Sequence, residues 1–246
     1  MQHLSGYFVT CLLALSTFGL ATAMASDATT ALTVNGSAKI ETGAQDSVLW
    51  LTPADSNQAG SAFTTNAVAF GPRYLFATFF QFQMTNSGGS GAADGIVFVL
   101  QTDGATALGG TGGNEGYGGI TPSVGVEFDT YYNAGIDIND NHVAILTDGQ
   151  LNDADSQTPY GVTNCQPPTG VFGCMANGDV WSVWIDYDGA SIHVALADNS
   201  TTRPADLISY PIDIRSVLGQ DSAFVGFTAA TAGGWDNHLI AHWQFR

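Results

Sequence analysis

The stretch that decides the fold runs from Val126 to His142 and reads VEFDTYYNAGIDINDNH. At its start, apolar Val126 and Phe128 alternate with acidic Glu127 and Asp129. Alternation with a period of two predicts a β-strand whose apolar side chains face a core and whose carboxylates share the opposite face. The loop that follows is rich in Asn and Asp, which are turn-forming residues. The segment therefore predicts a strand that delivers two carboxylates to the start of a polar loop.

The same kind of pattern recurs along the chain, in short aromatic or β-branched runs separated by Gly, Asn or Asp turns. These runs predict an all-β antiparallel sandwich, with one short helical turn at most, between Asp206 and Leu218. We find no internal repeat or linker after residue 26, so one domain over 26–246 is expected. A further strand is expected over the apolar run from Gly95 to Leu100. The residues expected to share a face in each alternating run are Tyr74, Phe76, Thr78, Phe80 and Phe82; Trp181, Val183, Ile185 and Tyr187; Ile192, Val194 and Leu196; and Leu239, Ala241, Trp243 and Phe245.

The composition narrows the classes of function. The chain has 246 residues, 30 of them Gly, and 45% hydrophobic residues, which suits a large core with many tight turns. Its net charge is −17 and it has five basic residues, so it is expected to repel nucleic acid and anionic membranes, whose phosphates need clustered Lys and Arg. The acidity favours cations and neutral ligands, although solubility alone also explains many Asp residues.

The N-terminal segment predicts export. An apolar run from Phe8 to Ala25 ends in Ala23-Met24-Ala25, a small-x-small cleavage pattern, although no Lys or Arg precedes the run. The run is short for a membrane span, so we expect a signal peptide over 1–25 and a secreted or periplasmic domain over 26–246 without a membrane span. A membrane anchor is the alternative.

Two cysteines follow the expected cleavage site. Cys165 and Cys174 form an even pair in a chain expected to be exported, which predicts a disulfide bond within the Pro- and Gly-rich loop 164–178. Two cysteines without nearby His or further Cys make a poor zinc site.

The decisive stretch also predicts a metal site. Glu127 and Asp129 would lie roughly 6–7 Å apart on one strand face and repel each other unless a cation lies between them. Carboxylate, amide and backbone oxygens from the following loop suit calcium. The His142 ring together with carboxylates suits manganese or zinc, so a two-metal site with shared carboxylates is physically sensible. The alternative is a solvated Asn/Asp turn between two strands.

Four stretches resemble the legume-type (L-type) lectin family, and they follow one another along the chain in the same order as in that family. The metal-loop pattern of that family, E-F-D-T-aromatic-x-N-x-x-x-D followed by His, matches 127–142. The resemblance implies a concanavalin-like jelly-roll sandwich that binds a sugar and has no enzymatic activity. An insertion over 152–177 indicates a bacterial-type member. The other matching stretches are Ala93 to Phe98, Gly109 to Ile120, and Val225 to Thr231 with His238 and Trp243 to Phe245 beyond.

The resemblance implies two ions, which support a cis peptide bond between Ala93 and Asp94. Ile138 and Asn152 stand where family members commonly have Pro and Ser, which weakens the case for the transition metal more than that for calcium. The implied ligands are Glu127, Asp129, Asp137 and His142 for a transition metal such as Mn²⁺, and Asp129, the Tyr131 carbonyl, Asn133 and Asp137 for Ca²⁺.

The resemblance also implies the sugar contacts. Asp94 would accept hydrogen bonds from two sugar hydroxyls, while the Asn133 amide and the Gly113 backbone N–H would donate. The Tyr131 ring would cover the apolar sugar face, and Trp235 could add a second aromatic platform. Without the family context, Asp94 reads as an ordinary turn residue and Trp235 as a packed loop aromatic.

Two other functions compete with sugar binding. A retaining glycoside hydrolase needs two carboxylates about 5–5.5 Å apart. The strand has no second Glu, and neither Glu41 nor Glu115 lies on a strand beside Glu127, which argues against hydrolysis. A structural or adhesive surface domain remains open, but the joint presence of Asp94, Gly113 and Asn133 favours a mono- or oligosaccharide partner. Homo-oligomers occur in the family and are possible here.

Overall fold

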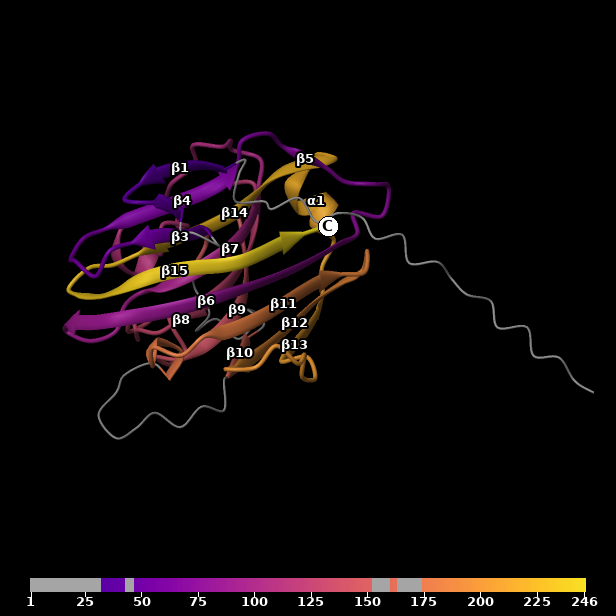
Figure 1. Cartoon of the computed structure of the whole chain (residues 1–246). Coiled ribbons are helices and arrows are strands. Elements are labelled where there is room, and N and C mark those ends of the chain that lie inside the picture. Colours follow the sequence, from indigo (N-terminus) through magenta and orange to yellow (C-terminus); the bar gives the residue numbers. More distant parts are fainter. Residues whose placement is uncertain (1–31, 43–46, 152–159, 163–173) are drawn as a thin grey trace, which may run out of the picture.

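The computed structural model describes residues 32–42, 47–151, 160–162 and 174–246. They form two antiparallel β-sheets that pack face to face, as the two layers of Figure 1 show. The predicted antiparallel sandwich is therefore confirmed. The expected signal peptide over 1–25 lies outside the described residues, and so does Cys165 of the expected disulfide bond. The signal peptide and the disulfide bond therefore stay predictions.

One sheet has eight strands and carries the decisive stretch. Its order is β1-β4-β14-β7-β8-β9-β10, and β5 pairs with β14. The strands are β1 (Leu32–Gly36), β4 (Ala59–Thr64), β5 (Val68–Ala69), β7 (Gly95–Gln101), β8 (Ser123–Asp129), β9 (His142–Thr147), β10 (Tyr160–Val162) and β14 (Ser222–Ala230).

The other sheet has seven strands in the order β13-β12-β11-β6-β15-β3-β2. In the described part of the chain, three short helices join the strands: η2 (Gly112–Asn114), η3 (Cys174–Ala176) and α1 (Ile214–Leu218). The single turn α1, capped by the Asp213 side chain, agrees with the expected short helix. The strands are β2 (Lys39–Thr42), β3 (Ser47–Thr52), β6 (Phe76–Gly89), β11 (Trp181–Tyr187), β12 (Ser191–Asp198), β13 (Ile208–Pro211) and β15 (Gly234–Phe245).

Aromatic side chains from both sheets fill the space between the layers. The Phe227 ring of β14 meets Phe80 of β6 edge to face at 4.8 Å and Trp243 of β15 at 4.9 Å. Phe128 of β8 joins them at 5.9 Å from Phe80. Full burial of each such side chain stabilises the fold by about 1.5–3 kcal/mol, so these rings fix how the two sheets pack.

A second, smaller core lies on the other face of the eight-stranded sheet. Tyr117, from the Gly-rich segment between β7 and β8, packs there with Val97, Val99 and Leu146. A Cβ placed on Gly125 would lie 3.2 Å from the Tyr117 ring, so the loop covers β8 closely. All seven residues of β8 are consequently buried, and the predicted carboxylate face lies under a loop.

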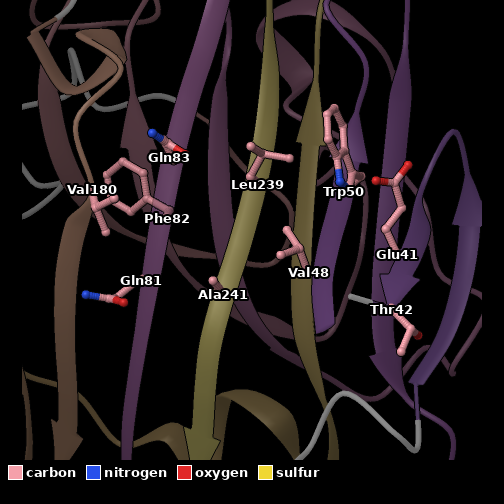
Figure 2. A pocket seen from close by; sticks show the side chains of 10 residues that line it. All are labelled: Glu41, Thr42, Val48, Trp50, Gln81, Phe82, Gln83, Val180, Leu239 and Ala241. Atoms are coloured by element: carbon pink, nitrogen blue, oxygen red, sulfur yellow. The ribbon is translucent and has the colours of Figure 1, made fainter. Parts of the chain in front are cut away.

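The predicted face of the last strand is wrong. Leu239 and Ala241 project from the outer face of the seven-stranded sheet, beside Trp50 (Figure 2), whereas Ile240 and Trp243 are buried. The pairing register with β6 shifts between Ala241 and Gln244, and His242 has a φ of 51°. This β-bulge adds one residue, so the side chains after it change face.

In the described part of the chain, no helix is long and apolar enough to cross a membrane.

Candidate functional site

Three candidate ligands meet where β8 and β9 end. Asp129 on β8 pairs with His142 on β9, and Glu127 lies two residues earlier on the same face. Ligand atoms of the three side chains all lie within 4.8 Å of one another, and His142 Nε2 is 3.6 Å from Glu127 Oε2. Each residue is at most 2% exposed. The strand register alone therefore builds a compact, buried group of two carboxylates and one imidazole.

The His142 ring is oriented for ligation. Its Nδ1 lies 3.1 Å from the backbone carbonyl oxygen of Asn139. Because a carbonyl can only accept, Nδ1 donates the hydrogen bond and the lone pair of the neutral ring lies on Nε2, on the Glu127 side. A hydrogen bond from the second ring nitrogen is the usual way in which proteins orient a metal-binding histidine.

The loop after β8 folds back on its own carboxylates. Asp129 Oδ1 accepts from the Tyr131 N–H at 2.7 Å, and Asp137 accepts from the Asn133 N–H. The Asp137 N–H donates in turn to the Asn133 carbonyl at 3.0 Å. These bonds hold Asp137, which is 6% exposed, close to the strand end, and Asn133 Oδ1 is buried without a hydrogen-bond partner.

The local electrostatics favour a bound cation. Burial, followed by the neighbouring Glu127, raises the pKa of Asp129 well above its usual range. Basic side chains pair elsewhere: Lys39 with Glu41, Arg203 with Asp186 and Asp206, and Arg215 with Asp221. Buried carboxylates are costly unless they are paired or bind metal, so the donor set fits a divalent cation.

Asp94 lies just before β7, beside the loop 130–141 that joins β8 to β9 and is called the metal loop below. The peptide bond between Ala93 and Asp94 is cis, as the resemblance implies. The Asp94 carbonyl accepts from the Thr130 N–H at 2.9 Å and from Thr130 Oγ1 at 3.0 Å, which ties it to the residue after Asp129. Its Oδ2 is buried without a hydrogen-bond partner, and burial raises the pKa of the carboxyl to about 7.

Gly113 and Asn133 lie against each other. A Cβ placed on Gly113 would lie 2.7 Å from Asn133 Oδ1 and 3.0 Å from its Nδ2. The neighbouring Gly112 N–H donates to the Thr231 carbonyl at 3.1 Å, and the Asp94 N–H donates to the Ala230 carbonyl at 3.0 Å. The structure thus brings the Asp94 loop, the Gly-rich loop, the metal loop and the end of β14 to one place.

The two aromatic candidates differ in their surroundings. Tyr131 lines a hollow of about 450 Å³ with Ser90, Thr130, Tyr132, Asn139 and Asp140, so its ring faces open space beside the metal loop. The Trp235 ring packs against Gly88 of β6, where an added Cβ would lie 2.7 Å from the Cε2 atom of the ring. Trp235 alternates along β15 with Asp236, which contacts Ala93, so the Trp235 ring points away from that contact.

Two acidic residues that the sequence analysis did not select belong to the same region. Asp236 is fully buried, and its Oδ2 accepts from the Ala93 N–H at 2.9 Å while its Oδ1 accepts from Ser87. Glu115, directly after η2, is also fully buried, and its carboxyl lies against Gly95 of β7. The sequence offered one signal for Glu115, namely a charged residue within a run of glycines.

A second hollow, of about 400 Å³, lies on the outer face of the seven-stranded sheet around β15 (Figure 2). Its sides are mostly apolar or amide side chains, including Trp50, Leu239 and Gln83. The ammonium group of Lys39 lies over the Trp50 ring, 4.9 Å from its centroid. Because the buried carboxylates and the cis peptide lie at the other sheet, the metal-loop region is the candidate functional site.

Comparisons with known proteins point to the same family that the sequence resembles. The model of the legume lectin β-barrel domain matches residues 23–242. The L-type lectin-domain containing receptor kinase VIII.1 of Arabidopsis thaliana is 30% identical over 205 residues, which cover 80% of this chain and 26% of the kinase. The chain therefore spans about a quarter of the length of this relative.

Solved lectins share the fold. A structure of peanut lectin with a 9mer peptide has a TM-score of 0.70 at 24% identity and covers 89% of this chain and 92% of its own. Basic winged bean lectin with Tn-antigen has a TM-score of 0.67 at 26% identity and covers 88% of this chain and 92% of its own.

Proposed function

Because the chain belongs to the L-type lectin family, we propose that it is a lectin whose sugar pocket depends on bound metal ions. The observation that carries the metal dependence is the buried group of Glu127, Asp129 and His142, whose ligand atoms lie within 4.8 Å of one another. Sugar binding follows from the family, and no covalent chemistry is involved.

The donor set suggests how two ions would be shared. Glu127 and His142 would serve a transition metal such as Mn²⁺, because imidazole with carboxylate suits that class. Asn133 Oδ1, which is buried without a hydrogen-bond partner, and the Tyr131 carbonyl would serve Ca²⁺. Asp129 and Asp137 would contribute to both ions. The ions would hold the loop in place rather than react.

The sugar would sit against Asp94, with Gly113 and Asn133 donating from the two adjoining loops. The Asp94 Oδ2 atom, which has no partner in the protein, is available to accept from sugar hydroxyls, and charged acceptors form the stronger hydrogen bonds. Tyr131 would cover the apolar sugar face from the hollow that it lines. Trp235 is a weaker candidate, since its ring packs on Gly88.

We also propose that the protein is exported, with a signal peptide over 1–25 and a lectin domain over 26–246. A disulfide bond between Cys165 and Cys174 would then brace the metal loop. The support for this role is that Met175, next to Cys174 in η3, donates its N–H to Asn141 Oδ1 at 3.2 Å. Asn141 directly precedes His142, so η3, the described end of this segment, adjoins the candidate metal site.

Neither competing function explains the site as well. A hydrolase must present its two carboxylates to a glycosidic bond, whereas the Glu127 carboxylate lies 3.6 Å from His142 Nε2 within the candidate metal group. A purely structural domain would not need Asp94, Gly113 and Asn133 side by side. Binding by homo-oligomers remains compatible with the proposal.

The test is a glycan array probed with residues 26–246 after treatment with a chelator, with and without added Ca²⁺ and Mn²⁺. The proposal expects binding that appears when metal is added and disappears in Asp94→Ala and Asn133→Ala. Trp50→Ala, in the other hollow, is the matched control and should bind normally. If metal raises the melting temperature but no glycan binds, the structural alternative gains, and if metal has no effect, the metal site is wrong.

A further inference from the structure

Glu115 carries a buried carboxyl that makes no hydrogen bond within the described part of the chain. It follows η2 in the Gly-rich segment and is fully buried, and both of its carboxylate oxygens lack a hydrogen-bond partner. Of the three Glu residues in the chain, Glu41 is exposed and pairs with Lys39, and Glu127 belongs to the metal group. A buried carboxyl without partners is costly, so its position needs a reason.

The Glu115 carboxyl occupies the space of a missing side chain. A Cβ placed on Gly95 would overlap Glu115 Oε1 and lie 2.8 Å from its Cδ. Gly95 on β7 is the register partner of Asp129 on β8, and side chains directly opposite each other across antiparallel strands have Cβ atoms about 4.5–5.5 Å apart. The carboxyl of Glu115 therefore stands directly beside the Asp129 side chain.

The charged groups that act most strongly on the Glu115 carboxyl are acidic. After burial itself, the interactions that raise the pKa of Glu115 come from Glu127, Asp129, Asp94 and Asp137, in that order. Three of these are the carboxylates assigned to the metal ions, and Glu127 acts most strongly. The buried, partnerless carboxyl is thus directed into the proposed metal site.

We propose that Glu115 is a further cation ligand, contributed to the metal site by the Gly-rich loop. This inference rests on the proposed function. Glu127, Asp129 and Asp137 carry three negative charges, whereas two divalent cations carry four positive charges, so Glu115 completes the neutralisation. Hard divalent cations bind carboxylate oxygen, and the number of charged ligands tunes their affinity.

The consequence is a direct link between metal and sugar pocket. Gly113 lies two residues before Glu115, and Glu115 donates its N–H to the Gly112 carbonyl at 2.8 Å. A cation held by Glu115 would fix the loop that presents the Gly113 N–H. Metal binding would thereby order a loop outside the segment 127–142.

The test is calorimetric titration of metal-stripped protein with Ca²⁺ alone and with Mn²⁺ alone. Glu115→Gln keeps the shape of the side chain but removes its charge, and Glu115→Leu is a second variant in case the first does not fold. We expect each to bind at least one of the ions at least tenfold more weakly than the wild type. Glu41→Gln, which removes the same charge from the surface, should change neither affinity more than twofold.

The outcomes separate this inference from the proposed function. If the wild type binds neither ion, the proposed function itself fails and the inference fails with it. If the wild type binds and both Glu115 variants bind equally well, only the inference is overturned. A crystal structure of the Mn²⁺- and Ca²⁺-loaded wild type gives an independent answer: a Glu115 oxygen about 2.0–2.6 Å from either ion supports it, and separations above about 4 Å overturn it.

Discussion

Replacing Gly113 with alanine isolates the contact between the Gly-rich loop and Asn133. The added Cβ would lie 2.7 Å from Asn133 Oδ1, 2.8 Å from its Cγ and 3.0 Å from its Nδ2. Gly113 does not have a positive φ, so alanine suits the backbone and the effect is steric. Since normal contact begins near 3.5 Å, the Asn133 amide must move by roughly 0.7–0.8 Å.

That displacement should affect binding more than folding. Asn133 would lose its alignment with Ca²⁺ and sugar, and a hydrogen bond to a charged group is worth about 1.5–3 kcal/mol. We therefore expect sugar affinity to fall by about 10–100-fold, because 1.4 kcal/mol corresponds to a factor of ten. The free energy of unfolding of the metal-free protein should change by less than about 1 kcal/mol, because the affected side chain is partly exposed and lies in a loop.

The assay is titration of metal-stripped Gly113→Ala with Ca²⁺, followed by titration of the loaded protein with the best glycan from the array. Gly71→Ala, away from the site, is the control, because its Cβ would have no atom outside its chain neighbours within 4 Å. If Gly113→Ala binds both ligands as tightly as the control, the pairing of Gly113 with Asn133 in one sugar pocket is refuted.

Three further predictions test the site and its surroundings. His142→Ala should weaken Mn²⁺ binding at least 100-fold and Ca²⁺ binding less, whereas His193→Ala at the surface should change neither; equal losses for both ions would contradict the assigned ligands. Burial raises the pKa of Asp236 from 3.8 to about 7, so between these values the unfolded chain loses this proton while the folded protein keeps it. The metal-free protein should therefore lose about 1.4 kcal/mol of stability per pH unit from this group as pH rises from 4 to 7, and no more above 7. Denaturant unfolding of Asp236→Asn should show a pH dependence that is flatter by this amount, and an unchanged slope would argue against the raised pKa. Trp50→Leu should leave glycan affinity within twofold of the wild type in the same titration, and a larger loss would move the sugar site to the other sheet.

Alternation in the sequence was sufficient to predict the sandwich and the metal group, because both follow from strand geometry. Once β8 is placed, Glu127 and Asp129 must share a face, and the register with β9 brings His142 opposite Asp129. The same reasoning failed at β15, where a bulge at His242 reverses the side-chain direction. A bulge changes pairing without a clear signal in the hydrophobic pattern, so Leu239 and Ala241 were assigned to the wrong face.

Residues brought to the site by loops were harder to predict. Asp236 acts through a backbone contact with Ala93, 143 residues away in the sequence, and no local pattern signals such a contact. Glu115 could not be predicted in this way, because alternation relates acids only along one strand, and Glu115 lies in the Gly-rich segment after η2. The Glu115 carboxyl instead reaches the sheet from the Gly-rich loop and occupies the space that a side chain on Gly95 of β7 would fill, opposite Asp129 of β8.

The loops at the site share hydrogen bonds, so a cation at β8 should act on all of them. Thr130 joins the metal loop to Asp94, and the Asp94 N–H joins that loop to Ala230 at the end of β14. The Gly112 N–H donates to the carbonyl of Thr231, the residue after Ala230. This bond connects the Gly-rich loop to the same end of β14. Without a cation, repulsion among buried carboxylates opposes this arrangement; with one, the same carboxylates hold it together. Metal binding and pocket formation are therefore expected to be coupled, and loss of metal should loosen every loop that contacts the sugar.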